Sequence, residues 1–232
     1  MATFVLLHGA WHDSSCWDEV IRELRQRDHE AIAPELPLDD PAATFEDRAH
    51  PAVKALAGAA DPVVVVGHSM SSAYAPLVAI AREGAVLVHL CPSLSPFPPP
   101  PGAPDRFRPE LPFPTARPDG ITVWDPDVAL EAIYGRLPEP LARELAGRLR
   151  PMAPPPDEFP LSGPPDVPTV LIYAADDEFF EPEWERLMAR EVLHLDPIEI
   201  PGGHFPMVED PAALAELLAS LATPSPSGRL PS

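Results

Sequence analysis

A run of four valines, followed by a serine between small residues, constrains this chain more than any other segment. Val63–Val66 are consecutive β-branched residues, which is typical of a strand buried on both faces. Gly67-His68-Ser69-Met70-Ser71 follows directly, and a helix-compatible run extends over residues 72–81. A serine between small residues at a strand-to-helix turn is the pattern of a nucleophile elbow, which exposes the serine oxygen above a parallel sheet. Most elbows have glycine at both flanks, whereas here the second flank is Ser71.

Alternating strand and helix patterns indicate the fold class. The predicted strands are Thr3–Leu7, Glu30–Ala33, Val63–Val66, Val86–Leu90, Thr169–Tyr173 and Ile198–Ile200. The predicted helices are Cys16–Arg27, Phe45–Ala59, Ser72–Arg82, Trp184–Val192 and Pro211–Leu221, the last with Asp210 as its N-cap. This alternation predicts an α/β fold with a mainly parallel six-stranded sheet and helices on both faces. Ligands bind such sheets at the carboxyl ends of the strands.

The alternation stops over residues 92–166, where many of the 36 prolines are concentrated. Proline favours extended segments over regular structure. Between the proline-rich arms we predict two helices, Val128–Tyr134 and Glu139–Leu149. Because the strand pattern resumes afterwards, we expect residues 92–166 to form a cap inserted into a single core of residues 1–91 and 167–221. A linker between two independent domains fits less well.

The net charge of −20, from 36 acidic and 16 basic residues, limits the partners of this chain. It repels nucleic acid and anionic membrane surfaces, so we expect neither as a partner. The charge indicates either a solvated acidic surface or a bias towards neutral or cationic substrates. The chain enters a predicted strand at once and has no apolar run near the roughly 20 residues of a membrane span, which favours the cytoplasm. The proline-rich tail, residues 222–232, is expected to be disordered.

The cysteines and histidines give no indication of a metal site. Cys16 and Cys91 are far apart in the sequence, and in a cytosolic protein both are expected to be reduced. No group of cysteines and histidines has the spacing of metal ligands, so we expect no metal.

Ser69 is the candidate nucleophile, although a serine at this position can also simply cap the following helix. A serine hydroxyl needs a base to take its proton. The candidate base is His204, which lies on a glycine-rich loop after the last predicted strand; the alternative is a loop histidine that only packs.

The imidazole needs a carboxylate to orient it, and we expect that group after the strand Thr169–Tyr173. Three acidic residues stand there in a row, and we choose the middle one among Asp176, Asp177 and Glu178. The order Ser69, Asp177, His204 is the order of nucleophile, acid and base in sheets that carry this elbow.

Acyl chemistry also needs backbone N–H donors for the developing oxyanion. We expect these from Met70, directly after the serine, and from Ala10, in the loop after the first strand. The candidate substrate-contacting residues are Trp11, Trp124, Tyr134 and Phe205. The apolar residues of the inserted segment either line a pocket or bury the cap against the sheet domain; they include Phe97, Phe107, Phe113 and Ile133. Three of its arginines either bind a substrate carboxylate or lie in solvent; they are Arg106, Arg108 and Arg117.

Together these residues resemble the α/β-hydrolase superfamily over nearly the whole chain. Phe4–Trp11, Cys16-Trp17, Asp177–Glu183 and Gly202–His204 are similar to segments of the small plant-type methyl ester esterases, their bacterial relatives and hydroxynitrile lyases. The resemblance implies no cofactor, a cap between the fourth and fifth strands, and the triad and oxyanion donors chosen above. Hydroxynitrile lyases carry a lysine after the catalytic histidine, where this chain has Phe205, so cyanogenic activity is not expected.

We therefore expect a serine hydrolase that cleaves an ester, thioester or lactone of a small, mostly apolar compound through an acyl-enzyme. Two alternatives stay open, because fold does not determine function. One is a biosynthetic tailoring enzyme that performs cyclisation, decarboxylation, dehydration or C–C cleavage on the same fold. The other is a non-catalytic receptor for a small molecule.

Overall fold

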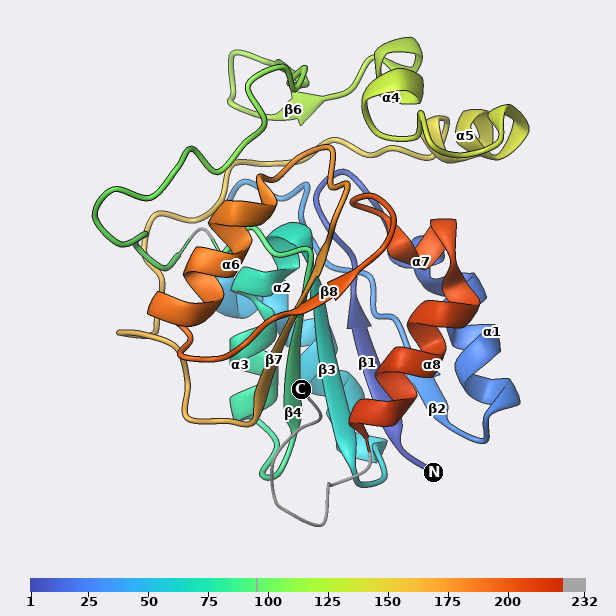
Figure 1. The fold of residues 1–232 in the computed structure, drawn as a ribbon, viewed down its shortest axis with the longest axis vertical. Helices are drawn as coiled ribbons and strands as arrows, with labels where there is room; N and C mark the ends of the chain where they lie inside the picture. The colour runs from blue at the N-terminus through green and yellow to red at the C-terminus, as the bar shows by residue number, and fades with distance from the viewer. Residues whose placement is uncertain (95, 223–232) are drawn as a thin grey trace.

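A six-stranded parallel sheet forms the centre of the molecule, with strand order β2-β1-β3-β4-β7-β8 (Figure 1). The computed structural model describes residues 1–94 and 96–222. The strands are β1 (Thr3–Leu7), β2 (Glu30–Ile32), β3 (Val63–His68), β4 (Val86–Leu90), β7 (Thr169–Ala174) and β8 (Ile198–Ile200). The predicted fold class is confirmed, and all of the predicted strands are present within two residues of their expected bounds.

The valine run occupies a central strand because both faces of that strand are covered. Strand β3 lies between β1 and β4, where Val64 is paired with Phe4 on one side and with Val86 on the other. Val64 and Val66 belong to the core on one face of the sheet, and Val63 and Val65 belong to the core on the other. A strand enclosed in this way needs apolar residues at every position rather than at alternate ones.

Helices cover the two faces of the sheet in separate layers (Figure 1). One layer contains α1 (Asp18–Gln26), α7 (Pro206–Glu209) and α8 (Pro211–Leu221). The other contains α2 (Phe45–Ala55), α3 (Ala75–Ile80) and α6 (Pro182–Glu191). As expected from the sequence, Asp210 caps α8 by accepting a hydrogen bond from the backbone N–H of Ala213. None of the helices in these described ranges is both long and apolar enough to cross a membrane.

The prediction of an α-helix starting at Ser72 was wrong. A 3₁₀ helix, η3 (Ser69–Ala73), follows β3, and α3 begins only at Ala75. Pro76 lies in the first turn of α3, where its missing N–H leaves no hydrogen bond unmade. Two other predicted helices are also shorter than expected, with 3₁₀ turns at η1 (Ser14–Trp17) and η2 (Leu56–Gly58).

The segment between β4 and β7 lies across the carboxyl ends of the strands (Figure 1). It contains α4 (Pro126–Ala132) and α5 (Glu139–Ala146) near their expected positions, and a short antiparallel pair that was not predicted, β5 (Thr115–Ala116) and β6 (Thr122–Val123). Polar contacts attach this segment to the sheet domain. The guanidinium of the fully buried Arg48 donates a hydrogen bond to the Pro154 carbonyl oxygen at 2.7 Å. The backbone N–H of Arg150 donates to the Trp11 carbonyl oxygen at 2.8 Å.

The tail that we expected to be disordered, residues 222–232, lies outside the described part of the chain except for Ala222.

Candidate active site

Ser69 follows β3 directly, in a backbone conformation that residues with a side chain seldom adopt. Its φ is 52°, in the left-handed region. The turn is also tight, because a Cβ at Gly67 would lie 2.6 Å from the Ala75 Cβ and 2.7 Å from the Ser71 carbonyl oxygen. Only glycine fits at position 67, and strain of this kind is common at functional sites. The turn projects Ser69 towards a cavity that its side chain lines.

Ser71, the unusual residue of the elbow, is completely buried and makes a specific contact. Its hydroxyl donates a hydrogen bond to the carbonyl oxygen of His8, at the end of β1. Glycine has no atom to make this bond. The serine therefore connects the elbow to the loop that contains Ala10.

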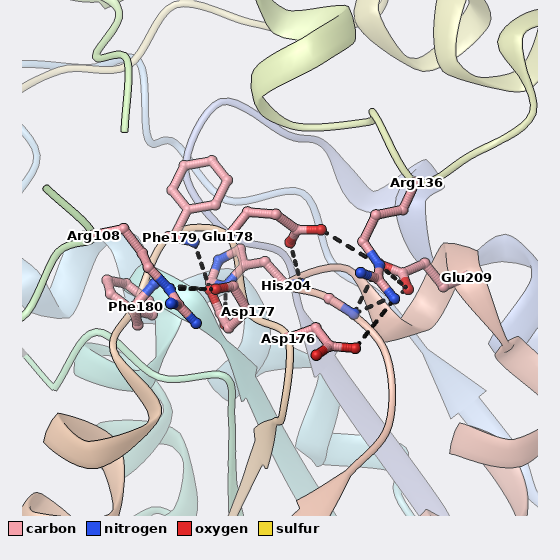
Figure 2. Close-up of polar contacts among 10 residues, drawn as sticks. Arg108, Arg136, Asp176, Asp177, Glu178, Phe179, Phe180, His204 and Glu209 are labelled. Carbon is pink, nitrogen blue, oxygen red and sulfur yellow. Dashed lines mark hydrogen bonds and ion pairs between the residues drawn. The ribbon is translucent and has the colours of Figure 1, made fainter. Parts of the chain in front are cut away.

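The structure brings Ser69, His204 and Asp177 into one hydrogen-bonded line. The Ser69 hydroxyl lies 2.9 Å from His204 Nε2, and His204 Nδ1 lies 2.7 Å from Asp177 Oδ2. Asp177 is held in turn by the backbone N–H groups of Phe179 and Phe180, which donate to its Oδ1 at 2.7 and 2.8 Å (Figure 2). The acid and the histidine are each 1 % exposed, so solvent does not compete for these bonds.

Two neutral histidines surround the His204 imidazole. His68 Nε2 donates to the His204 carbonyl oxygen at 2.8 Å, and burial together with His204 holds the pKa of His68 well below its usual value. His12 Nδ1 donates to the Ala10 carbonyl oxygen at 2.7 Å, and its Nε2 accepts from the Tyr134 hydroxyl at 2.7 Å. Burial lowers the pKa of His12 to about 4. Neither ring therefore adds a positive charge that would oppose protonation of His204.

A charged network that the sequence did not reveal supports the loop around His204 (Figure 2). Glu178 Oε2 accepts a hydrogen bond from the His204 backbone N–H at 2.9 Å, and Glu209 Oε2 accepts one from the Gly203 N–H at 3.0 Å. Arg136, in the turn between α4 and α5, lies 3.3–3.5 Å from three carboxylates, those of Asp176, Glu178 and Glu209. This arginine therefore links the inserted segment to the loops that carry the acid and the histidine.

Gly203 is the sequence signal of this close packing. A Cβ at this position would lie 2.7 Å from the Arg136 side chain and closer still to the Glu178 carboxylate. The sequence analysis took Gly202 and Gly203 as part of a glycine-rich loop and of the family resemblance, and did not predict this contact. Burial also raises the pKa of Glu178.

A cavity of about 180 Å³ opens above Ser69, between the sheet domain and the inserted segment. Its walls are mostly aromatic and apolar, and they include Ala10, Trp11, Met70 and Trp124. Trp11 and Trp124 pack edge to face, with ring centroids 5.7 Å apart, and Trp11 Nε1 donates to Thr122 Oγ1 at 2.9 Å. The two proposed oxyanion donors, Ala10 and Met70, therefore line the same cavity as the serine.

Two of the residues expected to contact substrate do not line this cavity. Tyr134 is 1 % exposed, and its hydroxyl is bonded to His12. Phe205 packs between the rings of His12 and His204, with centroid distances of 4.7 and 4.9 Å. Both residues therefore pack against His12 rather than facing the cavity. Arg106 and Ser93, in contrast, line the cavity. Arg106 was one of the arginines for which substrate contact and solvent were both left open, and Ser93 was not predicted.

Cys91, Asp177 and His204 form a cluster whose polar atoms lie within 4.8 Å of one another, which is compatible in size with a metal site. Burial, with Asp177 adding to it, raises the pKa of the Cys91 thiol well above its usual value, so the thiolate that a metal prefers is disfavoured. The acid and the imidazole are already hydrogen-bonded to each other. The donor set fits a hydrogen-bonded triad better than a metal site.

Comparison with known proteins identifies the family. A profile described as "Alpha/beta hydrolase family" matches residues 4–217, which is most of the chain. The chain belongs to the alpha/beta hydrolase family. Membership of this family agrees with the resemblance that the sequence predicted.

Individual relatives of this alpha/beta hydrolase are distant. A rice protein (Oryza sativa subsp. japonica) named Esterase PIR7B is 37% identical over 76 residues, and the match covers 28% of this chain and 28% of the rice protein. The match therefore spans less than a third of the length of that curated relative.

Solved structures of low sequence identity share the fold. A pyrethroid hydrolase from Sphingobium faniae JZ-2 has a TM-score of 0.76 and 22% identity, with 97% of this chain and 98% of that chain covered. A methylesterase from Arabidopsis has a TM-score of 0.71 and 19% identity, with 94% and 98% covered.

Proposed function

We propose that this alpha/beta hydrolase cleaves an ester, thioester or lactone of a small, mostly apolar compound through an acyl-enzyme on Ser69. The observation that carries the proposal is the hydrogen-bonded line from the Ser69 hydroxyl through His204 to Asp177, at 2.9 and 2.7 Å. The serine at the head of this line faces a small apolar cavity. The rice relative is also named an esterase, and the match covers 28% of each chain.

In the first half of the reaction, the Ser69 Oγ attacks the substrate carbonyl carbon while its proton passes to His204 Nε2. Asp177 stabilises the resulting imidazolium through its bond to Nδ1. The imidazolium then gives its proton to the leaving alkoxide or thiolate, and the acyl group stays on Ser69. Because His12 and His68 are neutral, they do not raise the energy of the imidazolium.

The oxyanion of the tetrahedral intermediate is stabilised by the backbone N–H groups of Ala10 and Met70. Met70 is at the start of η3, where N–H groups lack partners within the helix. Ala10 is positioned by the loop to which Ser71 is bonded through His8. In the second half of the reaction, water takes the place of the leaving group, and His204 acts first as base and then as acid.

The segment between β4 and β7 acts as the cap of this site. It contributes Trp124 and Met152 to the cavity wall. Residues 92–166 thus share in shaping the substrate cavity, and residues 1–91 and 167–221 carry the chemistry.

The proposal is tested with a fluorophosphonate probe and with p-nitrophenyl acetate, in the wild type and in Ser69→Ala. The wild type is expected to form a covalent adduct and to show burst kinetics, and the variant is expected to lose both, with a fall in kcat of at least about 10³-fold. Folding of the variant is checked by its thermal unfolding midpoint. A wild type that takes no label contradicts the proposal, and hydrolysis that survives in Ser69→Ala assigns the chemistry to other groups.

A further inference from the structure

A positively charged side chain lines the otherwise apolar cavity above Ser69. Arg106 comes from the first proline-rich arm of the cap, and its guanidinium lies 4.5 Å from the ring centroid of Phe107 and 5.9 Å from that of Trp184. These aromatic faces hold the guanidinium in place and satisfy none of its five N–H donors.

Among residues 1–94 and 96–222, no carboxylate forms an ion pair with Arg106. The one hydrogen bond of its guanidinium to these residues runs 3.3 Å from Nη1 to the Ser93 carbonyl oxygen. Arg108, two residues further on, lies 3.7 Å from the carboxylate of Glu181. Arg106 is thus a partly buried cation whose charge no carboxylate of the described residues balances, in a chain with 36 acidic and 16 basic residues. Burial lowers the pKa of Arg106, and no neighbouring carboxylate offsets that cost.

A second, independent polar group lies in the same wall. Ser93 is 7 % exposed and lines the cavity, and its Oγ has no hydrogen-bond partner among the described residues. A buried hydroxyl without a partner is costly unless a ligand satisfies it.

Ser93 also places this polar wall close to the nucleophile. The Ser93 N–H donates to the Ser69 carbonyl oxygen at 3.1 Å, and its own carbonyl oxygen accepts from Arg106. Ser69, Ser93 and Arg106 also line the same small cavity. An anionic group bound by Arg106 would therefore share this cavity with the reacting carbonyl.

Resting on the proposed function, we infer that the substrate is an ester or thioester that carries a carboxylate a few bonds from the scissile carbonyl, bound by the Arg106 guanidinium and the Ser93 hydroxyl. A planar guanidinium matches a carboxylate with two parallel N–H donors. A cavity of about 180 Å³ favours a compact substrate, such as a small monoester of a dicarboxylic acid or a short acyl ester of a hydroxy acid. The net charge of the chain suggests a bias towards neutral or cationic substrates. Inside the cavity, the positive charge of Arg106 favours an anionic substrate instead.

The test compares pairs of substrates in which a carboxylate is replaced by its neutral, equally shaped amide. The pairs are monomethyl succinate with methyl succinamate, monomethyl glutarate with methyl glutaramate, and acetoxyacetate with acetoxyacetamide. Proton release at constant pH gives kcat/KM for each compound. In the wild type, the anionic member of at least one pair is expected to be preferred by about 10- to 100-fold, the range of a hydrogen bond to a charged group.

Arg106→Gln is expected to remove most of this preference, and Arg106→Lys to retain part of it. Ser93→Ala is expected to reduce it by about threefold to tenfold. Arg117→Gln is the matched control, because Arg117 is an exposed arginine of the same cap arm, and its ratio of anionic to neutral turnover should equal that of the wild type.

The outcomes separate this inference from the proposed function. If Ser69 cleaves the ester bond of the neutral, amide-bearing compounds as fast as that of their anionic partners, the inference is overturned. The serine hydrolase proposal then stays intact. If Arg106→Gln does not fold, the ratio of kcat/KM between anionic and neutral compounds in the wild type is enough to decide this. Absence of turnover for every compound, together with absence of fluorophosphonate labelling, overturns both.

Discussion

At the scale of single residues, neighbouring carboxylates in this site have different environments. Asp177 is buried and accepts hydrogen bonds from His204, Phe179 and Phe180. Asp176, one position earlier, points to the surface, where its side chain is 63 % exposed and lies 3.5 Å from Arg136. These two adjacent residues in the turn after β7 therefore differ in burial and in hydrogen-bond partners, and only Asp177 is placed to orient the imidazole.

Asp177→Asn is expected to reduce kcat by about 10³- to 10⁴-fold, because an amide does not stabilise the imidazolium. Asp176→Asn is the matched control, and since a surface ion pair contributes little, its kcat should change by less than about threefold. Steady-state kinetics on p-nitrophenyl acetate measures both. Equal losses in the two variants, or a larger loss for Asp176→Asn, would refute the assignment of the acid.

At the scale of elements, the cap and the loop around His204 are connected through Arg136. Its guanidinium comes from the turn between α4 and α5, and its carboxylate partners come from the turn after β7 and from α7. Glu178 and Glu209 also hold the backbone N–H groups of His204 and Gly203. A change in the cap can therefore reach the histidine through two carboxylates, without any contact to the substrate.

Arg136→Gln is expected to lower kcat/KM by about threefold to tenfold, because the histidine loop is less well held and small displacements of catalytic groups are costly. The guanidinium is 41 % exposed, so the free energy of unfolding should change by less than about 1 kcal/mol per lost ion pair. Kinetics and urea unfolding measure the two effects.

Arg143→Gln is the control for this prediction. Arg143 is on the surface of α5, and its carboxylate partner, Glu139, belongs to the same helix. Added NaCl should lower the activity of the wild type and of Arg143→Gln more than that of Arg136→Gln, because salt screens exposed ion pairs. The same loss of activity in both variants would contradict a link through Arg136.

At the scale of the whole molecule, buried histidines make stability depend on pH. Burial lowers the pKa of His12 to about 4 and that of His89 to about 3, from an ordinary value of 6.5, and it also lowers the pKa of His8 and His68. Below pH 6.5 the unfolded chain binds protons at these sites while the folded chain does not. The stability that comes from burying neutral histidines is complete above about pH 6.5. It is lost progressively as the pH falls to the folded-state pKa, which is about 4 for His12 and about 3 for His89.

Buried carboxyl groups oppose this trend. Burial raises the pKa of Glu178 and, well above its usual value, that of Glu185. The folded chain keeps protons on these groups at a pH where the unfolded chain has lost them, so their contribution decreases as the pH rises above about 4.5. We expect the four histidines to outweigh these two carboxyl groups, so that the folded chain loses stability on acidification below pH 6.5.

His89→Leu tests this pH dependence without touching the active site. His89 is in β4, 1 % exposed, with no hydrogen-bond partner for Nδ1 in the described part of the chain. Between pH 7 and 5 the wild type is expected to lose about 2 kcal/mol more of its free energy of unfolding than the variant, at 1.36 kcal/mol per pH unit below 6.5. Urea unfolding at both pH values gives the numbers, and His50→Gln, an exposed histidine of α2, is the control. Parallel losses in His89→Leu and the wild type would contradict the burial argument.

Local features of the sequence were enough to predict the sheet and the order of the candidate groups along it. A run such as Val63–Val66 identifies its own strand, because a doubly covered strand excludes polar residues at every position. The turn residues that follow each strand can be located from that strand alone. Ser69, Asp177 and His204 were selected in this way, and parallel strands bring the ends of such strands to one edge of the sheet.

Contacts between distant segments were decided only by the tertiary structure. The bonds from Arg136 to Glu209 and from Arg106 to Ser93 join loops that no local pattern relates, and the same holds for Tyr134 with His12. A polar side chain in a loop leaves no periodic signal, because its partner depends on how the chain crosses the sheet. The sequence by itself therefore determined the scaffold and the candidate reacting groups, whereas the packing of the cap decided the charge and shape of the cavity above Ser69.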